Sequence, residues 1–286
     1  MRIVGCSLVA SAVRLDFPIL EALGSILSLC DEVIVNVGPS DDGTLDLIRG
    51  MHEPRLRVVE GRWDLSQGSA VLAVESQRAL DLARGDWAIY IQADEVLHED
   101  GVGLLRAAME GASADPRVEG LLVDFVHFYG TPEWTGASRA WYRREVRVIR
   151  PGREIHSRGD AQGFRVGPDD RKVRARSSGA AYFHYGWARP LDALRLKQQT
   201  DDQLYHGGAG KRASLGERLP RDVGLARFAG RHPARMEPWI AARRARMTPG
   251  FAPRRWDARR LSLLASLALE RLTGWRPFEY RNYVEV

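Results

Sequence analysis

The sequence predicts an α/β fold, in which a mostly parallel sheet is flanked by helices. Short β-rich segments alternate with helical segments over the first hundred residues, and the connections between them are short. A chain of 286 residues can bury the core of one large domain, alone or with an appendage. Hydrophobic residues at 44% and charged residues at 28% are typical of a soluble globular protein.

Four segments of the first hundred residues have the apolar, β-branched composition of buried strands. They are Ile3–Val9, Glu32–Val37, Leu56–Val59 and Trp87–Ile91. Helices are expected between them, starting near Pro18, over Thr44–Arg49 and from Leu72 to Ala83. In such a sheet, ligands bind beyond the carboxyl ends of the strands. The segments after Val37 and Ile91 are therefore the first candidates for a functional site.

After residue 100 the alternation becomes irregular. A helix is expected near Val102–Met109, then an aromatic loop through Trp134 and Trp141, and later a helix over Leu191–Tyr205. Further strands are predicted at Gly120–Phe128, Val146–Ile149 and Ala181–Tyr185. From Gly207 a Gly-, Arg- and Pro-rich stretch indicates a linker with short helical pieces. We therefore expect one domain over residues 1–206 and a basic, helix-rich extension over residues 207–286.

The positive charge is concentrated in the C-terminal extension. Residues 211–286 contain 17 Lys and Arg residues against 7 Asp and Glu residues, whereas the whole chain has a net charge of +5. The extension can be a solvated packing appendage, or it can attach peripherally to anionic lipid, because arginines flank an apolar helical face. That face is formed by Leu261, Leu264, Leu267, Ala268 and Leu272. We do not expect nucleic-acid binding, since no recognition module accompanies the charge.

Cysteine usage and targeting signals indicate a cytoplasmic protein. Cys6 and Cys30 lie in apolar segments and predict neither a disulfide framework nor a metal site. The N-terminus shows no signal-peptide pattern. No segment approaches the roughly 18 consecutive apolar residues of a membrane span. Peripheral attachment at the inner face of the membrane is the alternative to a freely cytoplasmic location.

The strongest candidate site is the segment Gln92-Ala93-Asp94-Glu95, which follows the fourth predicted strand. Two adjacent carboxylates leave the core here, beside the ligand-binding edge of the sheet. Magnesium and manganese take oxygen ligands and bind through one or two carboxylates together with substrate phosphates. Asp94 is thus a candidate ligand for a divalent metal that bridges a diphosphate. The alternative is that Asp94 and Glu95 cap the next segment.

A second candidate is the turn at residues 38–43, which leads from the second strand into a helix. It gathers backbone N–H groups and short side chains at a strand end. Asp42 is placed to accept a hydrogen bond from a nucleobase or a ribose. The expected nucleotide-binding residues at this edge also include Val9, Asn36, Gly38 and Ser40. A capped strand-to-helix turn without a ligand is the alternative.

Taken together, the two motifs carry a family resemblance. Ser-Asp-Asp-Gly-Thr at residues 40–44 and Gly-Asp-Trp-x-x-Tyr-x-Gln-Ala-Asp-Glu at residues 85–95 resemble the inverting family-two glycosyltransferases of the GT-A fold. The resemblance implies sugar transfer from a nucleoside diphosphate to a hydroxyl of a glycan or lipid-linked acceptor, as in cell-envelope polysaccharide synthesis. By position it implies that Asp42 helps to receive the nucleotide and that Asp94 binds the metal. Glu75 and Gln77 lie where the family contacts the nucleotide.

Two positions depart from the family pattern. Gln92 replaces the first Asp of Asp-x-Asp and can hydrogen-bond a ribose or phosphate without bringing a charge, with Ala93 beside it. The nucleotide-contacting Asp at the end of the second strand is replaced by Asn36, Val37 or Gly38. We therefore expect a divalent metal, manganese or magnesium, that binds weakly or only together with the sugar nucleotide.

An inverting transfer also needs a carboxylate that deprotonates the acceptor hydroxyl. The family takes this base from the acceptor half, and Asp160, in a Gly-flanked loop, is the first candidate here. Glu145, just before a predicted strand, is the second. Arg158 and Arg165 near Asp160 would lower the pKa of a carboxyl group, so a structural salt bridge is the alternative.

Two residues of the acceptor half are further candidates for the donor site. His184 leaves a strand just before Gly186, and the family carries a late His that closes the site on the metal or the diphosphate. Lys197, one of only three lysines, lies on the next predicted helix and can reach a phosphate. A buried core histidine and a solvated helix face are the respective alternatives.

Two other functions remain open. One is a non-catalytic module of the same fold that binds a nucleotide or a glycan. The other is a nucleotidyltransferase, which also uses a carboxylate-held metal. The segment Gly5-Cys6-Ser7-Leu8 is a poor match to the Gly-rich phosphate loop that a nucleotidyltransferase would carry near its first strand.

Overall fold

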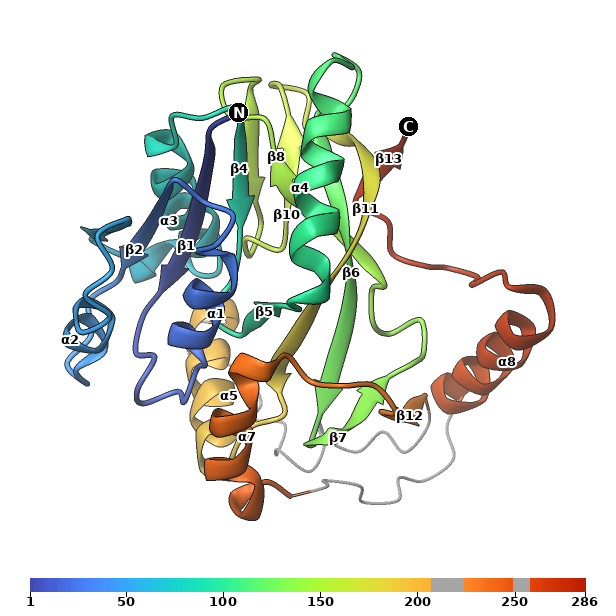
Figure 1. Cartoon of the computed structure of the whole chain (residues 1–286). Coiled ribbons are helices and arrows are strands. Elements are labelled where there is room, and N and C mark those ends of the chain that lie inside the picture. The colour runs from blue at the N-terminus through green and yellow to red at the C-terminus, as the bar shows by residue number, and fades with distance from the viewer. Residues whose placement is uncertain (207–223, 249–257) are drawn as a thin grey trace.

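The computed structural model describes residues 1–206, 224–248 and 258–286 (Figure 1). Within these ranges, 13 strands form one mixed sheet. Its main path runs through β3 (Leu56–Glu60), β2 (Glu32–Val37), β1 (Ile3–Val9), β4 (Trp87–Tyr90), β8 (Arg144–Ile149), β6 (Gly120–Tyr129), β11 (Arg171–Trp187), β10 (Gly163–Val166) and β9 (Ile155–Arg158). The other strands are β5 (Glu95–Leu97), β7 (Thr131–Gly136), β12 (Leu225–Arg227) and β13 (Tyr283–Glu285). The α-helices are α1 (Ile19–Ile26), α2 (Thr44–Arg49), α3 (Ala70–Leu82), α4 (Asp100–Ser113), α5 (Leu191–His206), α7 (Glu237–Arg243) and α8 (Ala258–Thr273).

The first four strands form the parallel half of the sheet. β1 runs parallel to β2 and β4, and β2 runs parallel to β3. Alternate residues of β1 enter different cores, so that Ile3 packs with α1 and α4, whereas Val4 packs with α3. In Figure 1, α1 and α4 lie on one side of this sheet and α3 lies on the other. Helices bury both faces, which confirms the predicted α/β fold.

The second half of the sheet introduces antiparallel pairs. β8 lies between β4 and β6 and runs opposite to both. β11 is parallel to β6 and far longer than the predicted strand Ala181–Tyr185. In its first part Val173 and Ala175 are buried while Lys172 and Arg174 are exposed. One face of this part is solvated and carries charged residues. The segment therefore lacks the continuous apolar run from which a strand was predicted further along.

Two predicted loops contain strands. The aromatic loop includes β7, which pairs with β6 and β12. The segment around Asp160 is a hairpin of β9 and β10, in which Phe164 pairs with Ser157. These strands depend on partners distant in sequence or on the hairpin partner itself, so local composition indicated them only weakly.

The described parts of the C-terminal extension pack against the first domain. β13 adds to the sheet beside β11, and Met236 and Trp239 join a core with Phe128 and Tyr185. The segment Gly207–Gly210, predicted as a linker, lies outside the described residues. The division of the chain at residues 206 and 207 therefore stays a prediction.

Ion pairs connect the basic extension to acidic residues of the first 206 residues. Arginines of the extension bind acidic residues of the body in four places. The pairs are Arg231–Glu99 (3.0 Å), Arg243–Asp16 (2.6 Å), Arg244–Glu133 (2.5 Å) and Arg246–Asp192 (2.7 Å). Each pair is at least partly solvated, so by itself it contributes little to the free energy of unfolding. Together they give the basic extension a partner within the same chain.

Helix α8 exposes much of its predicted apolar face. The side chains of Leu261, Leu264 and Leu272 are 57%, 38% and 84% exposed, whereas Leu263 points inward and is buried. Figure 1 shows α8 at the side of the molecule opposite to β1, β2 and β3. Among the helices of the described residues, none combines the length and the hydropathy of a bilayer-crossing segment.

Candidate active site

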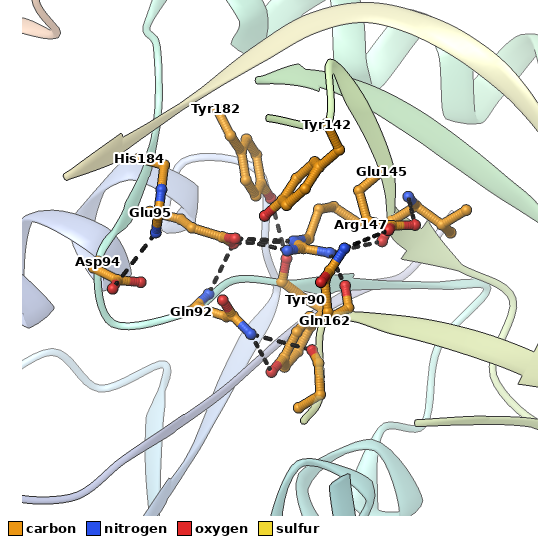
Figure 2. A network of polar contacts seen from close by, with 12 residues as sticks. Tyr90, Gln92, Asp94, Glu95, Tyr142, Glu145, Arg147, Gln162, Tyr182 and His184 are labelled. Carbon is orange, nitrogen blue, oxygen red and sulfur yellow. Dashed lines mark hydrogen bonds and ion pairs between the residues drawn. The ribbon is translucent and has the colours of Figure 1, made fainter. Parts of the chain in front are cut away.

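Asp94 lies just beyond the carboxyl end of β4 (Figure 2). Its side chain is buried, and its Oδ2 atom lies 3.6 Å from His184 Nε2 and 3.4 Å from Lys197 Nζ. His184 belongs to β11 and Lys197 to α5, so three distant segments converge on one carboxylate. Gly186 permits this approach, because a Cβ atom there would lie 2.7 Å from Asp94 Oδ2. The structure thus brings three predicted site residues together.

The surroundings of Asp94 carry an excess of positive charge. Burial alone raises the pKa of Asp94, but Lys197, His184 and Arg189 outweigh it and hold that pKa well below its usual range. Arg189 is fully buried and donates to the carbonyl oxygens of Leu15 (2.5 Å) and Gly186 (2.9 Å). Its Nε atom has no hydrogen-bond partner among the described residues. Lys197 therefore contacts this carboxylate and Arg189 acts on its charge, a setting that suits an additional anionic ligand.

A pair of histidines orients the ring of His184. The Nδ1 atoms of His127 and His184 lie 2.9 Å apart, and His127 Nε2 lies 2.9 Å from the carbonyl oxygen of Tyr142. Burial first, and then the neighbouring His184, lowers the pKa of His127 far below its usual value, so His127 is neutral. Its Nε2–H must donate to the carbonyl, which leaves its Nδ1 to accept from His184 Nδ1–H. His184 Nε2 then faces Asp94: with a proton it points its N–H at this carboxylate, and without one its lone pair can bind a metal.

Asp94 and His184 together suit a weakly held divalent metal. A carboxylate oxygen and an imidazole nitrogen are both ligands for manganese, and a ligating His commonly donates its second N–H to a neighbour, as His184 does. Within the described ranges, however, no group of three or more His, Cys, Asp and Glu side chains is arranged to hold a metal ion. A diphosphate and water would have to complete the coordination of a metal at this pair.

Glu95 has a different role from its neighbour Asp94. Glu95 and Arg147 are both fully buried, and Arg147 donates to Glu95 from Nη2 (2.7 Å) and Nε (3.0 Å). Arg147 also donates to the carbonyl oxygen of Gln162 (2.6 Å), and Glu95 accepts the backbone N–H of Gln92 (3.1 Å). Figure 2 shows Glu95 and Arg147 joined to each other beside Asp94. The second acid of the motif therefore holds the turn in place.

Gln92 lies beside the hairpin that carries Asp160. Its Nε2 atom donates to the carbonyl oxygen of Ala161 (3.1 Å). Asp160 is half-buried and accepts the backbone N–H of Gln162 (3.3 Å). Glu145 is fully buried, and burial raises its pKa. Of the two candidate bases, Asp160 is therefore the one that solvent reaches in this structure.

The predicted nucleotide-binding turn is tied to the loop after β1. Asp42 accepts the backbone N–H of Arg14 (2.7 Å) and the hydroxyl of Thr44 (2.6 Å). Ser40 Oγ accepts the backbone N–H of Ser11 (2.8 Å) and donates to the carbonyl of Gly38 (3.0 Å). Both predicted residues thus join two loops at the carboxyl edge of the parallel strands. Their contact with a nucleotide stays a prediction.

Asn36 and Glu75 meet behind this edge. Both are buried, and Asn36 Nδ2 donates to Glu75 Oε2 (2.8 Å). Asn36 Oδ1 and Trp63 Nε1 have no hydrogen-bond partner among the described residues. The indole of Trp63 packs on Gly38, where a Cβ atom would overlap the ring. Val9 ends β1 and Ala93 follows β4, and both side chains are buried in the hydrophobic core.

Gln77 is not brought to this edge. Its Oε1 atom accepts the backbone N–H of Ser157 (2.8 Å), and its Nε2 atom donates to Asp81 (2.7 Å). It lines an open groove of about 670 Å³ between α3 and β9, together with Arg84 and His156. This groove shares no lining residue with the Asp94 cluster.

Three buried residues of the site were not predicted from the sequence: His127, Arg147 and Arg189. Arg147 offered a signal, because a charged residue between Val146 and Val148 at a strand position needs a buried partner. His127 lies between aromatic residues in the same way. Arg189 precedes Pro190 after a strand and offered no such pattern.

No protein-family model and no curated protein matches this sequence. Among solved structures, the chain is similar to S. aureus TarS, with 14% identity and a TM-score of 0.44 over 72% of this chain and 40% of that one. Residues 1–349 of TarS in complex with UDP match with 13% identity and a TM-score of 0.41, over 73% and 70% of the two chains. Glucosyl-3-phosphoglycerate synthase from Mycobacterium tuberculosis, with Mg²⁺ and UDP, gives 17% identity and a TM-score of 0.29, over 44% and 43%. This chain thus spans 40% of the length of the longest TarS chain, and these similarities assign it no activity.

Proposed function

We propose that this chain is a glycosyltransferase that moves a hexose from a nucleoside-diphosphate donor to an acceptor hydroxyl, with inversion at the anomeric carbon. One observation carries the proposal. The Asp94 carboxylate follows β4 of the parallel half of the sheet, His184 and Lys197 contact it, and Arg189 adds positive charge, a setting that suits a diphosphate. The family-two motifs at residues 40–44 and 85–95 support the same assignment.

The proposed transfer is a single displacement. The acceptor oxygen attacks the anomeric carbon from the face opposite the diphosphate, and Asp160 takes the hydroxyl proton. The bond from the anomeric carbon to the diphosphate oxygen breaks, and the diphosphate leaves with the electron pair. Lys197 and Arg189 stabilise the charge that develops on the leaving group. Glu145 is the second choice of base, because it is sealed from solvent.

Asp94 and His184 would hold a divalent metal, manganese or magnesium, alongside the diphosphate. When bound, the metal would neutralise part of the leaving-group charge. Gln92 brings no second carboxylate, so we propose that this binding is weak and strengthened by the sugar nucleotide.

We propose a glycan or a lipid-linked molecule as acceptor, and a cytoplasmic protein that contacts the membrane peripherally. The exposed leucines of α8, followed by the exposed Trp275 and Phe278, suit insertion at the surface of a bilayer. The exposed Arg271 directly precedes Leu272 in the chain. This location would fit synthesis of a cell-envelope polysaccharide.

The test is a panel of UDP-, GDP- and dTDP-sugars, measured for binding and for release of nucleoside diphosphate. We expect the wild-type chain to bind at least one donor, and Asp94→Asn to lower turnover in the presence of Mn²⁺ by about a hundredfold or more. Asp169→Asn, an exposed aspartate in the β10–β11 turn, is the matched control and should behave as wild type. Release of pyrophosphate instead would indicate a nucleotidyltransferase. The proposal fails if no nucleotide sugar binds.

A further inference from the structure

We infer that Lys197 is the resident cation of the Asp94 site, that it competes with divalent metal for this carboxylate, and that it lets the chain bind nucleoside diphosphates without metal. The inference rests on the proposed function and names the cation that neutralises the donor site. It starts from the 3.4 Å contact between Lys197 Nζ and Asp94 Oδ2, the same oxygen that lies 3.6 Å from His184 Nε2. A metal held by Asp94 and His184 would meet the ammonium group at this oxygen.

The position of Lys197 is well defined by its neighbours. Its side chain is 18% exposed, and Nζ lies 5.3 Å from the centre of the Trp187 ring and 5.8 Å from that of Phe17. Aromatic rings favour a cation over a neutral group at such distances. A lysine held by two rings and a buried carboxylate is therefore a built cation site rather than a solvated side chain.

The number of carboxylates at the site decides whether a lysine can take the place of a divalent metal. In a site with two or more carboxylates, a divalent metal is needed to offset their charge before a diphosphate can approach. Here the first acid of the motif is Gln92, and Glu95 is neutralised by Arg147, which leaves Asp94 as the only carboxylate of the motif without an arginine partner. Lys197 and the buried Arg189 both act on this carboxylate, while Arg189 is also influenced by Asp16, which pairs with Arg243, and by Asp201. These two cations favour a diphosphate without metal, and a metal would add charge next to them.

The decisive experiment measures binding of UDP, GDP and dTDP by calorimetry, in EDTA and in excess Mn²⁺, together with Mn²⁺ affinity by electron paramagnetic resonance. We expect wild type to bind its preferred nucleotide in EDTA within about tenfold of its affinity in Mn²⁺. Lys197→Met should weaken binding in EDTA by about ten- to a hundredfold, because it removes a charged hydrogen-bond donor. The same variant should bind Mn²⁺ about tenfold or more tightly, because Asp94 loses its competing cation.

Two further variants make the result specific. Lys197→Arg keeps the positive charge and should retain most of the binding in EDTA, which separates loss of charge from loss of folding. Lys172→Met removes another of the chain's lysines, exposed on β11 far along the strand from His184, and should leave all affinities unchanged. Thermal unfolding of each variant checks the fold.

The outcomes distinguish this inference from the proposed function. Nucleotide binding that requires Mn²⁺, or equal binding by wild type and Lys197→Met in EDTA, overturns the inference and leaves the glycosyltransferase proposal standing. A chain that binds no nucleotide under either condition overturns both.

Discussion

His127 and His184 face each other through their Nδ1 atoms at 2.9 Å, so one ring must donate and the other must accept. The carbonyl of Tyr142 decides the direction, since it can only accept from His127. His127 therefore acts as a positioning residue: it fixes which nitrogen of His184 faces Asp94. This relationship joins β6 and β11, which run side by side in the sheet.

Replacing His127 tests whether this orientation matters for metal binding. His127→Phe removes the acceptor for His184 Nδ1–H, and we expect Mn²⁺ affinity to fall about tenfold to a hundredfold. His127→Gln can still accept from His184 and donate to Tyr142, and should retain most of the affinity. Nitrogen-15 NMR of the histidines should show a protonated Nδ1 on His184 in wild type and a mixed tautomer in His127→Phe. Equal affinities and unchanged tautomers in all three proteins would contradict the assignment.

The buried pair of Glu95 and Arg147 should control stability more than any surface pair. Arg147→Met leaves Glu95 uncompensated in the core, and we expect the free energy of unfolding to fall by about 3–5 kcal/mol. Urea denaturation measures this change. Arg49→Ala breaks the exposed Arg49–Glu60 pair and serves as the control, with an expected loss below about 1 kcal/mol. Similar losses in the two variants would show that Glu95 does not depend on Arg147.

Gly186 should tolerate no side chain, because Asp94 and His184 occupy the space that a side chain would need. Its backbone conformation is not the reason. The added Cβ atom of Gly186→Ala would crowd Asp94 Oδ2 at 2.7 Å and also press on His184. We expect nucleotide binding to weaken about tenfold or more as the pair is pushed apart. Gly103→Ala is the control, since a Cβ atom at this position of α4 meets nothing within 4 Å. An alanine at 186 that binds nucleotide as wild type does would place the donor site elsewhere.

Glu119 should make stability depend on acid pH. Burial raises its pKa, but Arg171 and Arg174 outweigh burial and lower that pKa from 4.5 to about 2. Because the pKa is lower in the folded chain, the stabilisation is complete above about pH 4.5 and is lost as the pH falls toward 2. With the exposure of both arginines taken into account, we expect about 1–2 kcal/mol.

The measurement for Glu119 is the free energy of unfolding of wild type and Glu119→Gln between pH 3 and pH 7. The difference between the two proteins should shrink as the pH falls through 4.5. A difference that stays constant over this range would show that the charge of Glu119 is not responsible.

The exposed face of α8 should decide whether the chain binds membranes. We expect wild type to float with vesicles that contain anionic lipid, and a variant with Leu261, Leu264 and Leu272 changed to Ser to remain in solution. Leu104→Ser, an exposed leucine of α4, is the control and should float as wild type does. A wild-type chain that does not float with the vesicles would make the membrane prediction wrong.

The sequence alone determined the parallel half of the fold and indicated the edge of the sheet at which the candidate site lies. Continuous apolar strands such as Ile3–Val9 can only be buried on both faces, and turn residues after Val37 and acids after Ile91 mark the carboxyl edge. Asp94, His184 and Lys197 could be proposed from their residue types and from the family motifs. These features are local, so they can be read along the chain.

Only the tertiary structure decided which charged groups lie next to those residues. The separate roles of Asp94 and Glu95 depend on Arg147, which arrives on an antiparallel strand 52 residues later. The long, half-solvated β11 brings His184 beside His127, and α5 then places Lys197 on the same carboxylate. Electrostatic balance depends on distance in space and on burial, and neither is encoded in the spacing of residues along the chain.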